Sequence, residues 1–204
     1  MALRHAKSLG AETLSICNTM GSTIPRESDS VLYTHAGPEI AVASTKALLT
    51  QVIALDLLAL YLASKRNSIT SDRIKELIAA LLQLPNKIEE ILETVEPLRE
   101  MTRGYKSATS VLFLGRHVGF PAALEGALKL KELAYMHAEG FAGGELKHGP
   151  IALIEAGTPV IAILPPAKSE IAEKMRSNIQ EVRARGARVI AIADQSHSLD
   201  LPDL

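Results

Sequence analysis

The stretch Ala108-Thr-Ser-Val-Leu-Phe-Leu114, followed by Gly115-Arg-His-Val-Gly119, decides the fold. An apolar run of this length is typical of a buried strand, and the two glycines mark a loop. Residues 121–136, rich in Ala, Leu, Glu and Lys, then favour a helix. A strand that runs through a glycine-containing loop into a helix is typical of an open parallel α/β sheet, where it often binds a phosphate. The glycine signal is weak alone, because neither GxGxxG nor a P-loop lysine pattern is present.

Strand and helix patterns continue to alternate downstream. Thr158-Pro-Val-Ile-Ala-Ile-Leu164 and Ala187-Arg-Val-Ile-Ala-Ile-Ala193 are short apolar runs of the kind expected for buried strands. Residues 168–185 between them favour a helix that ends at Gly186. The β-α-β-α-β order predicts a parallel, doubly wound sheet.

The upstream half of the chain holds a second, shorter set of such elements. Residues 12–18 and 31–34 are strand candidates, separated by a polar loop with Gly and Pro. Gly37-Pro38 then turns the chain into a helix that is expected from about Ile40 to Lys65. A helix end, a strand and a loop indicate a further α/β unit.

The order of elements predicts an α/β protein with two doubly wound parallel-sheet units joined by helices. The first unit is expected over 1–68 and, because it starts with the tail of a helix, is expected to be incomplete at its N-terminus. Helices expected over 71–83 and 86–103 make 69–104 a helical connector. The second unit is expected over 105–204 and, with no helix after its last strand, to be incomplete at its C-terminus.

The charge, cysteine and apolar content of the chain argue against several kinds of partner. The 204 residues carry 22 Lys and Arg against 23 Asp and Glu, so no excess of positive charge attracts nucleic acid or an anionic membrane. Cys17 is the only cysteine, which favours a reducing compartment, and no Cys or His cluster has metal-ligand spacing. Residues 47–63 are apolar, but Gln51 and Asp56 interrupt them, and we expect no membrane span. With no signal peptide either, the expectation is a cytoplasmic protein without metal or cofactor.

A stripe of charge runs along the helix expected over 121–136. At 3.6 residues per turn, Glu125, Lys129 and Glu132 fall within about 60° of one another on one face. This pattern also fits an exposed face that is stabilised by ion pairs at i,i+4 and i,i+3. Four leucines spread around the helix instead favour a largely buried helix, whose charged stripe faces a cleft. They are Leu124, Leu128, Leu130 and Leu133.

A carboxylate beside an ammonium in a largely buried setting suits proton transfer at a carbon next to a carbonyl. The carboxylate takes the proton, and the ammonium stabilises the negative charge that develops on the enediolate. Aldose–ketose isomerisation requires this chemistry. His148, within Gly144-Glu-Leu-Lys-His-Gly-Pro150, is a second candidate for proton transfer near neutral pH, the alternative being a surface or interface histidine.

Four motifs together resemble one known family. They are Glu39-Ile-Ala-Val-Ala-Ser-Thr-Lys46, Leu124-Glu-Gly-Ala-Leu-Lys-Leu-Lys-Glu132, Gly144-Glu-Leu-Lys-His-Gly-Pro150 and Asn178-Ile-Gln-Glu-Val-Arg-Ala-Arg-Gly186. They resemble the isomerase region of the glutamine:fructose-6-phosphate amidotransferases, the glucosamine-6-phosphate synthases, and the similarity covers essentially the whole chain. In that family the region is a pair of sugar-isomerase (SIS) domains, each a five-stranded parallel sheet flanked by helices.

The resemblance implies catalytic roles for three residues. Glu132 is expected to move a proton between C1 and C2 of the fructose 6-phosphate imine, and Lys129 is expected to help stabilise the enolamine. His148 is expected to assist opening of the sugar ring, and in the family it is donated to the active site of the partner subunit of a homodimer. Glu125 lies within the same motif and is expected to have a supporting role at most.

Two residues of the first unit, Val42 and Ser44, match positions that contact the sugar in the family. Other parts of the family pattern are not found: the glutaminase domain that supplies ammonia, the Ser/Thr-rich phosphate loop and the tail lysine that forms a Schiff base. The expectation is therefore a fragment of the synthase that is inactive alone. The alternative is a stand-alone SIS module that binds a phosphosugar and regulates a partner, although the chain carries no helix-turn-helix or basic patch.

Overall fold

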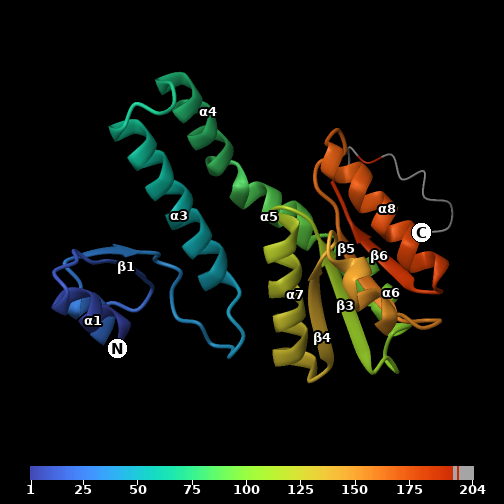
Figure 1. The fold of residues 1–204 in the computed structure, drawn as a ribbon. Helices are drawn as coiled ribbons and strands as arrows, with labels where there is room; N and C mark the ends of the chain where they lie inside the picture. The colour runs from blue at the N-terminus through green and yellow to red at the C-terminus, as the bar shows by residue number, and fades with distance from the viewer. Residues whose placement is uncertain (195–196, 198–204) are drawn as a thin grey trace. The chain divides into compact units, whose positions relative to one another are not determined.

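The computed structural model describes residues 1–194 and 197 (Figure 1). The chain forms two compact units, residues 1–96 and 97–204. The predicted strand, loop and helix over residues 108–136 lie in the second unit. Its core is a four-stranded sheet, and the stretch 108–119 supplies one of the two central strands and the loop that follows it.

The sheet of the second unit is parallel throughout and has the strand order β4-β3-β5-β6. Its strands are β3 (Ser110–Gly115), β4 (His137–Ala142), β5 (Pro159–Ile163) and β6 (Arg188–Ile192). Helix α7 (Gly119–Ala134) connects β3 to β4, and α8 (Glu170–Ala184) connects β5 to β6. The two helices cover opposite faces, which confirms the predicted doubly wound parallel sheet.

Strand β3 is buried on both faces because its side chains alternate between two apolar clusters. Val111 and Phe113 pack with residues of α7, whereas Leu112 and Leu114 pack with residues of α8. Neighbouring β5 follows the same rule, with Val160 turned to the α8 cluster. A central strand of a parallel sheet is apolar at nearly every position for this reason, and the run 111–114 has that composition.

Helix α7 packs closely against the sheet because the residues between them are small. Ala123 and Ala127 are its buried side chains on that face. A Cβ atom added to Gly126 would lie 2.7 Å from the ring of Phe113, and one added to Gly140 of β4 would lie 3.0 Å from the backbone of α7. The tightest contact is at Gly115, whose added Cβ would lie 2.0 Å from the carbonyl oxygen of Gly119.

The prediction of a largely buried helix over 121–136 is wrong for this chain. Leu124, Leu128 and Leu133 are exposed by 46%, 40% and 61%, and only Leu130 packs partly against the cluster beneath α7. The sheet-facing stripe of α7 is built from Gly and Ala, so most of the leucines lie on other sides of the helix. Leucines on several sides of a helix therefore do not show that each of those sides is buried.

The first unit contains a two-stranded parallel sheet and several helices. Its strands are β1 (Leu14–Cys17) and β2 (Ser30–Tyr33), and its helices are α1 (Ala2–Ser8), α2 (Thr23–Glu27), α3 (Lys46–Lys65), α4 (Ser71–Leu82) and α5 (Leu84–Leu92). Helix α6 (Val95–Arg103) follows at the junction with the second unit. The single helix predicted over 86–103 is therefore interrupted at residues 93–94.

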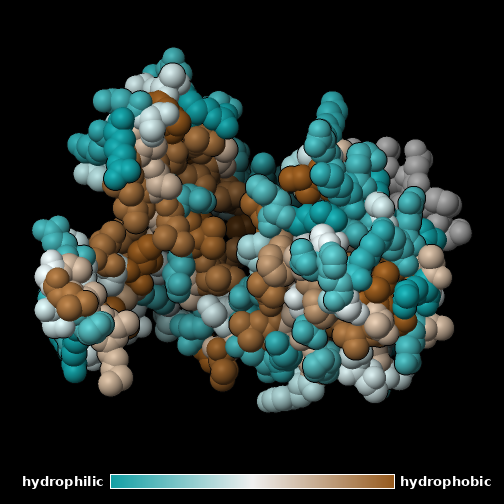
Figure 2. Space-filling model, in the orientation of Figure 1, coloured by the Kyte–Doolittle hydropathy of each residue, from teal (hydrophilic) through white to brown (hydrophobic). Residues whose placement is uncertain are grey.

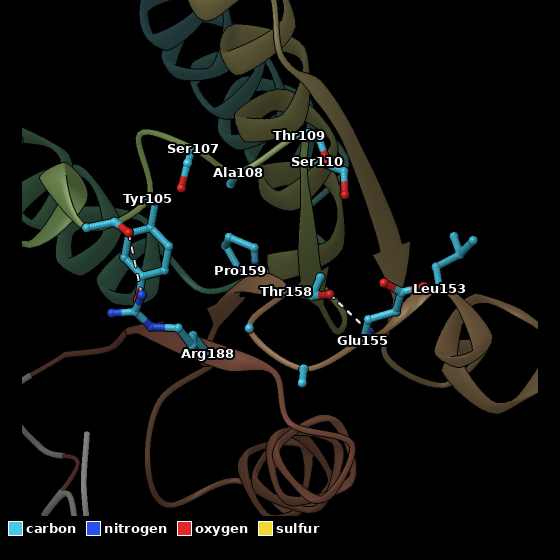
Figure 3. Close-up of a pocket in the computed structure, with 13 residues that line it drawn as sticks. Tyr105, Ser107, Ala108, Thr109, Ser110, Leu153, Glu155, Thr158, Pro159 and Arg188 are labelled. Carbon is cyan, nitrogen blue, oxygen red and sulfur yellow. Dashed lines mark hydrogen bonds between the residues drawn. The ribbon is translucent and has the colours of Figure 1, made fainter.

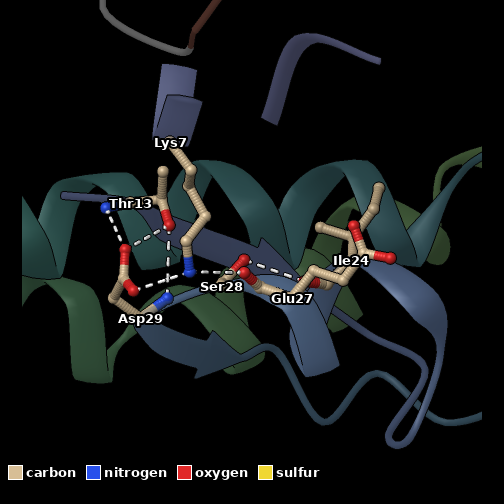
Figure 4. A network of polar contacts seen from close by, with 6 residues as sticks. All are labelled: Lys7, Thr13, Ile24, Glu27, Ser28 and Asp29. Carbon is tan, nitrogen blue, oxygen red and sulfur yellow. Dashed lines mark hydrogen bonds and ion pairs between the residues drawn. The ribbon is translucent and has the colours of Figure 1, made fainter. Parts of the chain in front are cut away.

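A polar network joins α1 to the strands of the first unit (Figure 4). Lys7 Nζ donates to Asp29 Oδ1 at 2.7 Å, and the hydroxyl of Thr13 donates to Asp29 Oδ2 at 2.7 Å. The bond from Lys7, followed by those from Thr13, holds the pKa of Asp29 well below its usual range. The carboxylate of Asp29 therefore stays ionised at neutral pH and fixes the start of β2.

Helix α3 starts at Lys46 and not near Ile40 as predicted. The reason is a side-chain cap from the preceding loop, because the carboxylate of Glu39 accepts hydrogen bonds from Ala47 N and from the hydroxyl of Thr45. By contrast, α4 is capped by the residue directly before it, because the hydroxyl of Thr70 accepts a hydrogen bond from the backbone N–H of Arg73.

Most of the apolar surface of α3 is exposed within the first unit, and Figure 2 shows apolar residues along α3 and α4. This helix is long and apolar enough to cross a membrane, so Gln51 and Asp56 do not by themselves exclude a membrane span. One such helix is weak evidence, since the core helix of a soluble domain passes the same test. The absence of a membrane partner stays a prediction.

Two short elements were missed from the sequence. Helix α2 lies between the first two strand candidates, where a polar loop was expected, and β4 follows the helix expected over 121–136, where no element was predicted. Residues 137–142 contain Glu139 and Gly140, which have low strand propensity. They form a strand because they pair along the whole of β3 and because Gly140 admits the backbone of α7.

We expect Gly115→Ala to destabilise the second unit by about 3 kcal/mol or more, because the new methyl group meets backbone that cannot move aside. Gly104→Ala is the matched control, since its added Cβ has no neighbour nearer than 3.5 Å, and we expect a change within about 0.5 kcal/mol. Urea unfolding followed by circular dichroism measures both. Equal midpoints for the two variants would contradict the close approach of α7.

Candidate active site

The charged stripe predicted on α7 is present as a compact group of three side chains. Lys129 Nζ lies 2.6 Å from Glu132 Oε2 and 3.3 Å from Glu125 Oε1. The side chain of Lys129 is 21% exposed and each glutamate side chain is 30% exposed, so all three are largely but not fully shielded from water. The three residues lie together as their spacing predicts, although leucines beside them are exposed.

The hydrogen bond from Lys129 to Glu132 raises the pKa of Lys129 above its ordinary value. Partial burial opposes this effect, and Glu125 adds to it through a weaker contact. Lys129 is consequently an ammonium at neutral pH and can stabilise a developing negative charge. Two carboxylates share this one cation, and a carboxylate is one of the groups that act as general bases in enzymes.

His148 lies on a loop that is fixed at several points. Gly143 N donates to the carbonyl of Gly115 at 2.9 Å where β4 ends, and Leu146 is fully buried in the core. Lys147 Nζ pairs with Glu181 at 2.9 Å. The 3-10 turn Leu146–His148 then leaves the side chain of His148 exposed. Within the described part of the chain, no hydrogen bond or ion pair joins His148 to the three charged residues of α7.

Val42 and Ser44 lie in the first unit, on the loop that leads from β2 to α3. Ala43 between them is buried, with 1% of its surface exposed, whereas Val42 is 98% exposed. The cap on α3 from Glu39 and a hydrogen bond from Lys46 Nζ to the carbonyl of Pro38 hold the two ends of this loop together. The loop therefore presents Val42 outward from a fixed backbone.

A polar network that was not predicted from the sequence lies between the loop after β3 and α8. Arg116 Nε donates to Asn178 Oδ1 at 2.8 Å, and Asn178 Nδ2 donates to Glu181 Oε2 at 3.2 Å. Burial acts against the charge of Glu181, but the hydrogen bonds from Lys147, Asn178 and Ser177 lower its pKa below the ordinary value. The signal in the sequence is Asn178 itself, a polar residue at a core position of α8, between Met175 and Val182.

A separate cavity of about 460 Å³ lies at the amino ends of β3, β5 and β6 (Figure 3). The guanidinium of Arg188 stacks on Tyr105 at 4.6 Å from the ring centroid, and Thr158 accepts a hydrogen bond from Glu155 N. Ligands of open parallel sheets bind at the carboxyl ends of the strands, so this cavity is not at the usual position. Among residues 1–194 and 197, no three His, Cys, Asp or Glu side chains gather as metal ligands.

The order β4-β3-β5-β6, with helices on both faces, makes the second unit a doubly wound α/β domain. The sequence pattern of the SIS domain matches residues 1–61 and 104–199, and the chain belongs to this family. The expected boundaries at 68 and 105 stay predictions.

Curated relatives and a solved structure agree with this membership. The chain is 58% identical over 204 residues to glutamine–fructose-6-phosphate aminotransferase (isomerizing) of Streptomyces coelicolor, covering 99% of this chain and 33% of the relative. It is 60% identical over 198 residues to the Corynebacterium diphtheriae protein of the same name, covering 96% and 32%. The C-terminal domain of glucosamine-fructose-6-phosphate aminotransferase from Francisella tularensis superposes with a TM-score of 0.92 at 39% identity, covering 96% of this chain and 55% of that one.

These matches confirm the resemblance that the four motifs indicated. The chain spans about a third of the length of the curated relatives it matches. It therefore corresponds to part of the isomerase region of such a protein.

We expect Glu132→Gln to lower the pKa of Lys129 more than Glu125→Gln does, because the contact to Glu132 is the shorter of the two and the main cause of the upward shift. The two variants remove the same charge from the same helix and serve as controls for each other. A pH titration of the Lys129 Nζ resonance by ¹⁵N NMR measures the shift. An equal or larger effect of Glu125→Gln would show that Glu132 is not the principal partner.

Proposed function

We propose that the chain is the isomerase part of an enzyme that makes glucosamine 6-phosphate from fructose 6-phosphate and glutamine-derived ammonia. The observation that carries the proposal is the group of Glu125, Lys129 and Glu132 on α7, in a chain that is more than half identical to aminotransferases of that name. The activity belongs to the longer protein. We expect the 204-residue chain alone to be inactive, because substrate positioning supplies a large part of rate enhancement.

In the proposed reaction a proton moves from C1 to C2 of the open-chain fructose 6-phosphate imine. The carboxylate of Glu132 takes the proton from C1 and returns it to C2. The imine nitrogen gains a proton as the enolamine forms, and the C1 hydroxyl loses its proton as C2 is protonated and C1 becomes the aldehyde. The ammonium of Lys129 stabilises the negative charge that develops while the C1–H bond breaks. Glu132 is chosen over Glu125 because the family motif assigns it this role and because it makes the shorter contact with Lys129. Glu125 is assigned a supporting role, in which it helps to hold Lys129 in place.

His148 is assigned to ring opening of the sugar in the partner subunit of a homodimer. Its exposure on a fixed loop, without a contact to the charged group of α7 in the described residues, supports a role outside its own site. The exposed leucines of α7 supply an apolar surface for association, since exposed apolar patches commonly mark interfaces. Val42 and Ser44 are assigned to contacts with the sugar.

We further propose that the protein is cytoplasmic and acts in the synthesis of amino-sugar nucleotides such as UDP-GlcNAc. A single cysteine and a net charge of −1 support a reducing compartment and the absence of nucleic-acid partners. The proposed partners are the sugar phosphates and a second copy of the chain, with no metal or cofactor.

We expect Glu132→Gln to reduce formation of glucosamine 6-phosphate by about 100-fold to 10,000-fold, the usual effect of removing a general base. The variant is made in a protein that carries this chain together with the segments of its longer relatives. Hydrolysis of glutamine, assayed as glutamate release, should be retained. Lys131→Gln is the control, because Lys131 is exposed and lies off the charged stripe. Near-normal sugar isomerisation by Glu132→Gln would refute the assignment of the base.

The dimer is tested by mixing two inactive variants of that longer protein, Glu132→Gln and His148→Ala. If His148 acts in the partner's site, each mixed dimer has one site with both defects and one with neither. Random exchange in an equal mixture then gives about a quarter of wild-type activity, since half of the dimers are mixed. Subunit exchange is verified by mass spectrometry of differently labelled chains. Exchange without recovery of activity would place His148 in its own site or outside the chemistry.

A further inference from the structure

A small basic pocket lies at the carboxyl ends of β3 and β4, next to α8. Its volume is about 180 Å³. We call it the Arg116 pocket, and its other charged or hydroxyl side chains are Lys147, Lys174, Ser177 and Glu181. It is separate from the charged group of α7, because α7 and α8 cover opposite faces of the sheet.

The guanidinium of Arg116 is held in place but has most of its donors available. Its Nε donates to Oδ1 of Asn178, a side chain that is only 4% exposed and is fixed in turn by Glu181. In the described residues, neither terminal nitrogen of Arg116 has a hydrogen-bond or ion-pair partner. A partly buried guanidinium whose two terminal NH₂ groups lack protein partners is suited to bind an oxyanion in bidentate fashion.

Two glycines create the space around this guanidinium. A Cβ atom added to Gly143 would lie 2.6 Å from Asn178 Oδ1 and 3.2 Å from Arg116 Nε, so a side chain there would displace the network. One added to Gly144 would lie 3.5 Å from a terminal nitrogen of Arg116, at van der Waals contact distance. Larger residues at these positions would fill the pocket or move Arg116.

The charge of the pocket is positive. Three cations, Arg116, Lys147 and Lys174, border it, and Glu181 is its only carboxylate. Glu181 pairs with Lys147 at 2.9 Å, which leaves Lys174 without an ion-pair partner among the described residues. The hydroxyl of Ser177, on the same helix, donates to Glu181 Oε1 at 3.4 Å, so the donors available to a ligand are those of the cations.

We propose that the Arg116 pocket binds a phosphate group, as free phosphate or as a phosphate monoester, at a site distinct from the proposed isomerase site. Its position supports this ligand, because the loop after β3 lies where the strand order reverses, and open parallel sheets bind anionic ligands outside the carboxyl ends of strands at such a point. A volume of about 180 Å³ accommodates a phosphate and a few attached atoms. The proposal concerns binding and does not depend on the proposed reaction.

The test is a titration of the 204-residue chain with inorganic phosphate and, separately, with fructose 6-phosphate, followed by ³¹P NMR at constant ionic strength. We expect saturable binding that Arg116→Gln weakens by about tenfold or more, because charge-assisted bidentate contacts are lost. Lys174→Gln should weaken it by a few-fold, since one cation is removed. Lys168→Gln is the matched control, since Lys168 is an exposed lysine outside the pocket, and it should leave the affinity unchanged.

Two features keep the test decisive. Arg116→Gln removes a partner of Asn178 and could disturb the fold. Lys174→Gln provides an independent readout, because the Lys174 side chain makes no hydrogen bond or ion pair among the described residues. The proposal is overturned if phosphate does not bind saturably up to about 20 mM, or if Lys168→Gln weakens binding as much as Lys174→Gln. It is also overturned if Lys129→Gln abolishes binding while Arg116→Gln does not, because the phosphate would then occupy the α7 site. Failure of the isomerase assignment appears instead in turnover of the Glu132→Gln variant.

Discussion

The close approach of α7 to the sheet is the constraint on which the second unit depends. Gly115, Gly126 and Gly140 remove side chains from the contact, and Ala123 and Ala127 fill what is left. With one face of the helix committed to this contact, the charged residues can project only on the sides that the sheet does not cover. The same packing that stabilises the domain therefore determines where its reactive groups lie.

The charged group on α7 combines two properties that are difficult to reconcile at a protein surface. Its side chains are shielded enough for the contacts of Lys129 to raise its pKa, and exposed enough for a small molecule to reach them. One cation shared by two carboxylates can stabilise an anion and still provide a base. In a helix, this arrangement requires only the spacing 125, 129 and 132, which places all three on adjacent turns.

The features that the sequence predicted are those set by local periodicity. The strand β3, the helices α7 and α8, and the meeting of Glu125 with Lys129 all follow from repeats of two or 3.6 residues. The features that it missed depend on distant partners. β4 exists because β3 lies beside it, and the cap of α3 comes from Glu39, several residues before the helix begins. Periodicity also overestimated the burial of α7, since it cannot tell which side of a helix a sheet covers.

The anchored loop before His148 loses little conformational entropy when another group binds to this histidine. Leu146 is fully buried two residues earlier, and Lys147 is paired with Glu181, so the backbone of this turn is ordered when the domain folds. A flexible loop would lose about 1–2 kcal/mol per residue in conformational entropy at the moment of encounter. Here only the side-chain rotamers of His148 remain to be fixed. A group that binds to His148 therefore finds its backbone already ordered. Binding then needs no slow ordering of the loop, which favours a fast and reversible contact.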